Sequence, residues 1–144
     1  MGTASTITST DRSTTRSRSL RREAAIAALA ATAANVAVWT AGRAADVSFL
    51  VTPLGAKAPT QVGIVLVVLT TLIMFAVGMG LFALAARRSD RWARALLAAG
   101  VLVAVVSASG PLSTAEDTST GVLLAAMHLL TGATFAVTAS RARR

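Results

Sequence analysis

Four long apolar stretches separated by short polar segments form the dominant pattern of the chain. They cover residues 24–41, 62–86, 92–109 and 120–140. A helix of 18 residues spans about 27 Å and one of 25 residues about 37 Å, so each stretch suits a hydrocarbon core of roughly 30 Å. The apolar residues are clustered rather than repeated on one face, which indicates a bilayer as their solvent. The pattern predicts an all-α fold, an integral membrane four-helix bundle.

The segments outside these stretches divide the chain into a tail and one membrane domain. Residues 1–20 are rich in Ser, Thr and Arg and almost free of apolar residues. Such a segment buries too little surface to offset its ordering entropy, so we expect a disordered tail. Residues 21–144 form the four-span domain, in which residues 42–61 are interrupted by Pro53, Gly55 and Pro59 and are too broken for a span.

Two polar signals predict the ends of the third helix. Residues 87–91 form a tight basic turn, where Ser89 or Asp90 is expected to cap the helix start. The Gly110-Pro111 pair is expected to terminate the helix, because proline lacks the amide that continuation needs.

Basic residues decide the orientation that we predict. Of the fourteen Lys and Arg, all but Arg43 and Lys57 fall on one side of a four-span bundle. The positive-inside rule makes that side cytoplasmic, with both termini, and predicts a multi-pass protein of the bacterial plasma membrane. Trp39 and Trp92 then lie at opposite membrane interfaces, where tryptophan is enriched.

Composition narrows the classes of partner and cofactor. The chain is 54% hydrophobic and 14% charged, and 144 residues are too few to bury so much apolar surface in a soluble domain. The net charge of +8 comes from residues at the ends of apolar stretches, so we predict contact with the bilayer and its anionic lipids and no nucleic-acid partner. The absence of cysteine excludes disulfides, thiol catalysis and iron–sulfur clusters, and no cofactor is predicted.

The first apolar stretch allows two alternatives. Arg21 and Arg22 before an Ala-rich stretch resemble an export signal that would be cleaved near residues 35–37. Glu23 and Ala24 follow where a strongly apolar start is expected, which argues against cleavage. A Ser- and Arg-rich start that is poor in acidic residues also resembles an organelle transit peptide.

Two polar residues inside the apolar stretches are the candidate site. His128 lies about 10–12 Å, and Asn35 about 9 Å, below the outer ends of their spans. Because either group alone in lipid is costly, we expect a hydrogen bond between them that joins the first and fourth helices. This bond either pins the bundle or belongs to a ligand or proton site. One histidine without cysteine or embedded carboxylates cannot complete a zinc site, so no metal is predicted.

The outer loop and the small residues each have two interpretations. Glu116 and Asp117 either attract a cation or a basic partner, or form a solvated turn before a helix N-terminus. Small residues at four-residue spacing in the fourth stretch, Gly132 among them, predict close helix contacts. These contacts lie either within one chain or between the copies of a homo-oligomer.

The layout resembles an actinobacterial family of small four-span membrane proteins of unknown function. The similarity rests on the Arg-flanked first stretch that reaches Val38-Trp39, the basic turn before the third stretch, and Gly110-Pro111-Leu112. It also rests on residues 124–129, Leu-Ala-Ala-Met-His-Leu, and on the arginines that end the chain. The resemblance implies a four-span fold over roughly residues 20–144 and no catalytic residues.

Three function classes follow, in decreasing order of support. The first is a non-enzymatic accessory or structural component of the cell envelope, with a membrane protein as its expected partner, because no catalytic constellation is visible. The second is a small oligomeric transporter or channel that uses His128 and Asn35. The carboxylate of small proton-coupled exporters has no counterpart, since Glu23 lies at the edge of its span. An enzyme is third, and we predict that the chain is not one.

Overall fold

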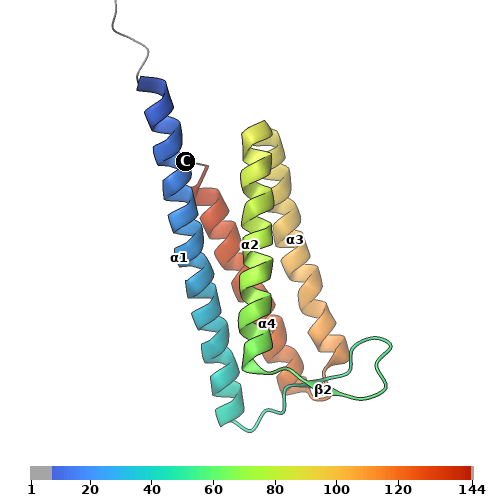
Figure 1. Ribbon diagram of the computed structural model, residues 1–144. Coiled ribbons are helices and arrows are strands. Elements are labelled where there is room, and N and C mark those ends of the chain that lie inside the picture. Colours follow the sequence, from blue (N-terminus) through green and yellow to red (C-terminus); the bar gives the residue numbers. More distant parts are fainter. Residues whose placement is uncertain (1–7, 144) are drawn as a thin grey trace, which may run out of the picture.

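The computed structural model describes residues 8–143, and the side chains of residues 21–143. It is an up-and-down bundle of four helices, shown in Figure 1: α1 (Thr8–Ala44), α2 (Ile64–Arg88), α3 (Asp90–Thr114) and α4 (Thr118–Arg141). Each helix contains a segment long and apolar enough to cross a membrane. The prediction of an all-α bundle of four such helices is therefore confirmed.

Helix α1 is longer than the first apolar stretch. It begins at Thr8, so the helix continues into the segment that the sequence predicts to be disordered, while residues 1–7 lie outside the described part. Its membrane-length portion is Arg21–Ala44. Extending an existing helix avoids the unfavourable nucleation step, which is why a Ser- and Thr-rich segment can continue one.

Helix α3 does not end where the sequence predicts. It continues through Pro111 to Thr114, so the predicted termination at Gly110-Pro111 is wrong. The hydroxyls of Ser113 and Thr114 donate to the Gly110 carbonyl oxygen, and the amide of Ala115 donates to that of Pro111. These bonds retain the last turn although proline removes one helix hydrogen bond.

The turn between α2 and α3 is a single residue, Ser89. Its side-chain oxygen accepts a hydrogen bond from the Trp92 amide at 3.3 Å, which is the N-cap arrangement. Of the two caps that the sequence allows, Ser89 is the one used.

A short antiparallel sheet, which the sequence analysis does not predict, fixes the segment between α1 and α2. Strands β1 (Leu50–Val51) and β2 (Thr60–Gln61) pair with each other, and Val51 also bridges to Ala115 in the α3–α4 connection. The segment that interrupts the spans is therefore anchored on two sides at the end of the bundle (Figure 1).

Glycines bring the helices together around one aromatic ring. A Cβ atom at Gly100 of α3 would lie 2.4 Å from the Phe135 ring, and Gly78 of α2 borders the same ring. Phe135 also meets Phe82 edge to face at 6.4 Å. At Gly132 the contact is between helices, since a Cβ there would lie 2.2 Å from Ala104 of α3. The predicted close contact at Gly132 is thus made within the chain.

Large apolar side chains cover the outside of the bundle. On α3 the exposed fraction reaches 58% at Val103 and 63% at Leu102. Only 6% of the most apolar 18-residue segment of α3 is buried inside the bundle, against 33% of the corresponding segment of α4. Exposed apolar surface on this scale is unfavourable in water, so these flanks fit lipid.

Candidate functional site

Asn35 is the polar centre of the bundle interior. It lies on α1, is 2% exposed, and its Nδ2 donates to Thr71 Oγ1 of α2 at 3.0 Å and to Thr131 Oγ1 of α4 at 2.9 Å. One amide group therefore joins three helices. A hydrogen bond from Asn35 does join α1 to α4, but the acceptor on α4 is Thr131 and not the predicted His128.

The two threonines determine the orientation of this amide. Thr71 donates its hydroxyl hydrogen to the Val67 carbonyl at 2.7 Å, and Thr131 donates to the Met127 carbonyl at 2.9 Å. Both hydroxyl oxygens are therefore left as acceptors, which suit the donating nitrogen of Asn35. The Asn35 Oδ1 atom is buried and has no partner among the described residues.

His128 does not bond to Asn35, and the predicted pair is wrong. Its Nδ1 lies 2.8 Å from the Leu124 carbonyl oxygen of the same helix, and its side chain is exposed. Thr131, three residues later on α4, is the residue that reaches Asn35. Since a carbonyl oxygen only accepts, Nδ1 carries the hydrogen and Nε2 is left as an acceptor in the neutral ring.

Asp117 connects the start of α4 to the segment after α1. Its Oδ1 accepts from the Thr120 amide at 2.7 Å, and its Oδ2 accepts from the hydroxyls of Ser48 and Thr120, both at 2.8 Å. Thr120 Oγ1 in turn accepts from the Phe49 amide at 3.1 Å. The interpretation of Asp117 as a residue before a helix N-terminus is confirmed, because it is the N-cap of α4.

These donors change the acidity of Asp117. The hydrogen bond from the Thr120 amide, followed by those from the hydroxyls of Ser48 and Thr120, lowers the pKa of Asp117 below its ordinary value of 3.8. Hydrogen bonds to the charged form favour ionisation. The carboxylate is thus stabilised where it holds the outer segment.

Phe49 closes the same end of the bundle. Its ring is fully buried and stacks on Trp39 at 6.0 Å, and a Cβ at Gly42 would lie 2.6 Å from it. The backbone φ of Phe49 is +53°, in the left-handed region that a bulky residue rarely adopts. Burial of the ring and the bond to Thr120 hold this strained conformation.

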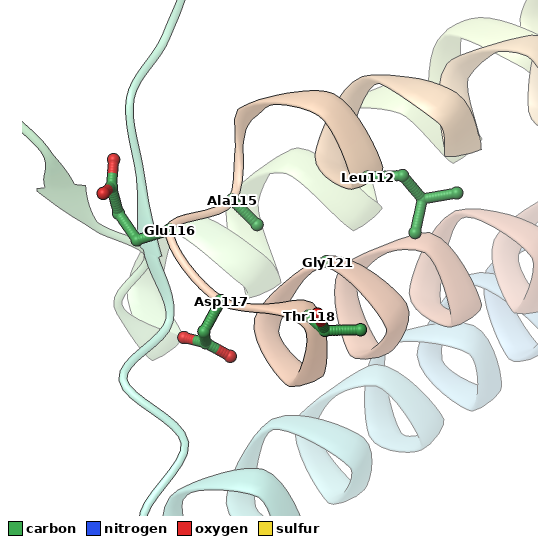
Figure 2. A pocket seen from close by; sticks show the side chains of 6 residues that line it. All are labelled: Leu112, Ala115, Glu116, Asp117, Thr118 and Gly121. Carbon is green, nitrogen blue, oxygen red and sulfur yellow. The ribbon is translucent and has the colours of Figure 1, made fainter.

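Glu116 points away from Asp117. It accepts a hydrogen bond from Thr52 Oγ1, and Figure 2 shows the two carboxylates directed to different sides of the α3–α4 connection. A hollow of about 240 Å³ lies beside them and is lined by Leu112, Ala115, Glu116, Asp117, Thr118 and Gly121. Because the carboxylates diverge, they do not together present a cation site.

The two tryptophans lie near opposite ends of the bundle but differ in exposure. Trp39 is half-buried, and its Nε1 donates to the Val62 carbonyl oxygen at 2.9 Å. Trp92, at the start of α3, is 64% exposed. Trp39 therefore holds the start of α2 through its indole N–H, and the interface role of both residues stays a prediction.

Charge is divided between the two ends of the bundle. The start of the membrane-length part of α1, the α2–α3 turn and the end of α4 meet at one end, as Figure 1 shows. The described basic residues there are Arg21, Arg22, Arg87, Arg88, Arg91, Arg94, Arg141 and Arg143. The other end carries three acidic residues and two basic ones, among residues 43–57 and 116–117.

No group of three or more potential metal ligands, counted over His, Asp and Glu, occurs within the described part of the chain.

The comparisons with known proteins give one match. Residues 15–144 match the model of a family described as "Family of unknown function (DUF6069)". The chain belongs to this family. No curated protein and no solved structure matches the DUF6069 chain. The predicted resemblance to a family of unknown function is confirmed, whereas the actinobacterial origin stays a prediction.

The partners of the polar residues in this DUF6069 protein are not predicted by its sequence. Thr71 and Thr131 gave no usable signal, because residue counting places them about 14 Å and about 17 Å below the outer ends of their stretches, deeper than Asn35 at about 9 Å. Ser48 and Thr120 gave none, because their contact depends on how the outer segment folds back over α4.

Proposed function

We propose that this chain is a multi-pass protein of the bacterial plasma membrane, with its basic end and both termini in the cytoplasm. The four apolar helices and their exposed apolar flanks support insertion. The division of charge between the two ends supports the orientation, because arginine and lysine gather on the cytoplasmic side of membrane proteins.

Within the membrane the protein acts as a non-enzymatic accessory or structural component. The observation that carries this proposal is the bonding of Asn35, whose amide nitrogen is used in full to join α1, α2 and α4. A polar group that holds three helices together serves architecture. His128, the other polar candidate, is exposed, and its Nδ1 bonds to a carbonyl oxygen of its own helix.

The expected partners are lipids and another membrane protein or a second copy of the chain. The arginines at the basic end suit anionic headgroups, because each arginine near a membrane surface adds about 1 kcal/mol of attraction. The lateral partner would contact one of the exposed apolar flanks of the bundle, such as that of α2.

The accessory role is tested on the full chain, expressed in its native host and extracted in a mild detergent. Native mass spectrometry of the extracted complex is expected to show a second membrane protein at fixed stoichiometry. The same complex is expected from His128→Ala, because a scaffold does not need the imidazole. A homo-oligomer that retains a small molecule, and loses it in His128→Ala, would contradict the accessory role.

A second candidate, an oligomeric transporter, is favoured by one observation. His128 is an ionisable side chain exposed on a membrane-length helix, and such residues commonly mark pathways. Proteoliposomes loaded with a pH-sensitive dye test this function. Proton leak or exchange in the wild type that disappears in His128→Ala but persists in the neighbouring Ala133→Ser would support transport.

A further inference from the structure

The loop between β1 and β2 carries an apolar side chain that the chain itself leaves uncovered. Leu54 is 98% exposed, and every residue from 53 to 59 is exposed. We call residues 53–59 the outer loop tip. Its sequence, Pro-Leu-Gly-Ala-Lys-Ala-Pro, contains no acidic residue and one lysine, Lys57.

The base of this tip is firmly attached to the bundle. The Thr52 amide donates to the Thr114 carbonyl oxygen at 2.8 Å, and the Glu116 amide donates to that of Leu50 at 3.0 Å. Within the tip, the Ala56 amide donates to the Pro53 carbonyl at 2.9 Å, and Gly55 has a φ of +84°. The exposed leucine is therefore presented by a hydrogen-bonded turn with an anchored base.

The tip projects sideways rather than along the bundle axis. Figure 1 shows the loop before β2 reaching past the end of α3, at the level where the helices end. The flank of α3 is apolar and exposed, as at Val105 and Leu112, so in a bilayer it borders acyl chains. A loop that overhangs this flank lies above lipid.

We propose that the outer loop tip is a lipid anchor, with Leu54 inserted at the interface of the outer leaflet and Lys57 beside lipid phosphates. This inference rests on the proposed membrane insertion. It follows from the full exposure of Leu54, the lateral reach of the tip and the lack of acidic residues in it. Apolar side chains gain by entering the headgroup–acyl boundary, and a neighbouring cation binds phosphate there.

The lack of cysteine in the natural chain allows a direct test with single thiols. Leu54→Cys, Ala45→Cys and Ala133→Cys are each labelled with nitrobenzoxadiazole, and the full chain is placed in phosphatidylcholine–phosphatidylglycerol nanodiscs at one chain per disc. Ala45 is exposed just after α1 and serves as the aqueous reference, and Ala133, exposed on α4, serves as the lipid reference.

The expected result is that the label at position 54 emits at shorter wavelength than the label at position 45. It should be quenched by headgroup nitroxide lipids and shielded from iodide. Lys57→Glu in the Leu54→Cys chain should weaken this lipid quenching in discs that contain phosphatidylglycerol and not in pure phosphatidylcholine.

Three results would overturn the anchor. A label at position 54 that behaves like the one at position 45 would place the tip in water. Shielding that occurs only in crowded proteoliposomes, and is lost at one chain per disc, would assign the tip to a second copy of the chain. A label at position 133 without lipid quenching would contradict membrane insertion itself, and thus separate that failure from failure of the loop alone.

Discussion

At the scale of single residues, Asn35 shows how a polar side chain can serve the interior of an apolar helix bundle. Its side-chain amide donates to two threonine hydroxyls, and each hydroxyl donates in turn to a backbone carbonyl oxygen of its own helix. Each threonine therefore connects the backbone of its helix to the side chain of Asn35. Its need for a partner could be predicted from the sequence, because an unpaired amide in lipid is costly. The identity of the partner could not.

The reason lies in the rotation of the helices. When apolar residues cover all sides of a helix, the sequence carries little information about which side faces inward. Counting residues places His128, at about 10–12 Å, closer in depth to Asn35 than Thr131, at about 17 Å. In the folded bundle Thr131 nevertheless reaches Asn35, whereas His128 is exposed.

Replacing Asn35 tests this connection. Asn35→Ala removes two interhelical hydrogen bonds, worth about 0.6 kcal/mol each on average in membranes, and leaves a small cavity. We expect the free energy of unfolding to fall by about 1–3 kcal/mol. Unfolding by sodium dodecyl sulfate, followed by circular dichroism, measures it. Ser109→Ala, which removes a bond within α3, is the control, and equal stability of the two variants would contradict the pinning role.

At the scale of the helices, close approach of α3 and α4 depends on Gly132. Replacing it with alanine places a methyl group against Ala104. We expect Gly132→Ala to lower the free energy of unfolding by about 1–3 kcal/mol, the usual cost of overpacking. Gly80→Ala in α2 is the matched control, because no atom lies within 4 Å of its Cβ position, and alanine favours a helix by about 1 kcal/mol. If Gly132→Ala left the free energy of unfolding unchanged, α3 and α4 could move apart without loss of stability, and the close approach would not be needed.

The capping of α4 predicts a pH dependence. Because the folded pKa of Asp117 lies below its ordinary value of 3.8, its stabilising contribution is fully present above that value. The contribution is lost as the pH falls through the folded pKa. We expect wild-type stability to fall more steeply than that of Asp117→Asn between about pH 5 and pH 2, since asparagine also caps helices but does not titrate.

Thermal unfolding in detergent at matched ionic strength measures this difference. If the unfolding temperatures of the two proteins changed with pH in the same way, the charge of Asp117 would not contribute to holding α4.

Some elements can be predicted from the local sequence, whereas others depend on contacts between residues that are distant in the chain. Length and apolarity suffice to predict four helices, since few other structures satisfy backbone groups in lipid. The strand pair is two residues per strand and depends on contact with Ala115, which is distant in sequence. The extension of α3 through Pro111 likewise depends on bonds made by the residues that follow it.

At the scale of the whole molecule, the two ends of the bundle are chemically different. We expect Ala45→Cys to react with a membrane-impermeant maleimide on intact cells, and Arg91→Cys to react only after lysis. The first position lies at the acidic end and the second in the arginine cluster, which the positive-inside rule assigns to the cytoplasm. Labelling of Arg91→Cys on intact cells would reverse the orientation, and labelling of both would contradict a sealed four-span topology.

The one-residue connection at Ser89 also determines how the bundle can move. With so little chain between them, α2 and α3 cannot rotate or slide independently, so mechanically they form one rigid lever. The other two connections, residues 45–63 and 115–117, are longer, but they are bonded to each other, as by Ser48 to Asp117 and by the Glu116 amide to the Leu50 carbonyl. Any movement of the α2–α3 pair relative to α1 and α4 would therefore have to break hydrogen bonds at the end of the bundle where Phe49 and Asp117 lie.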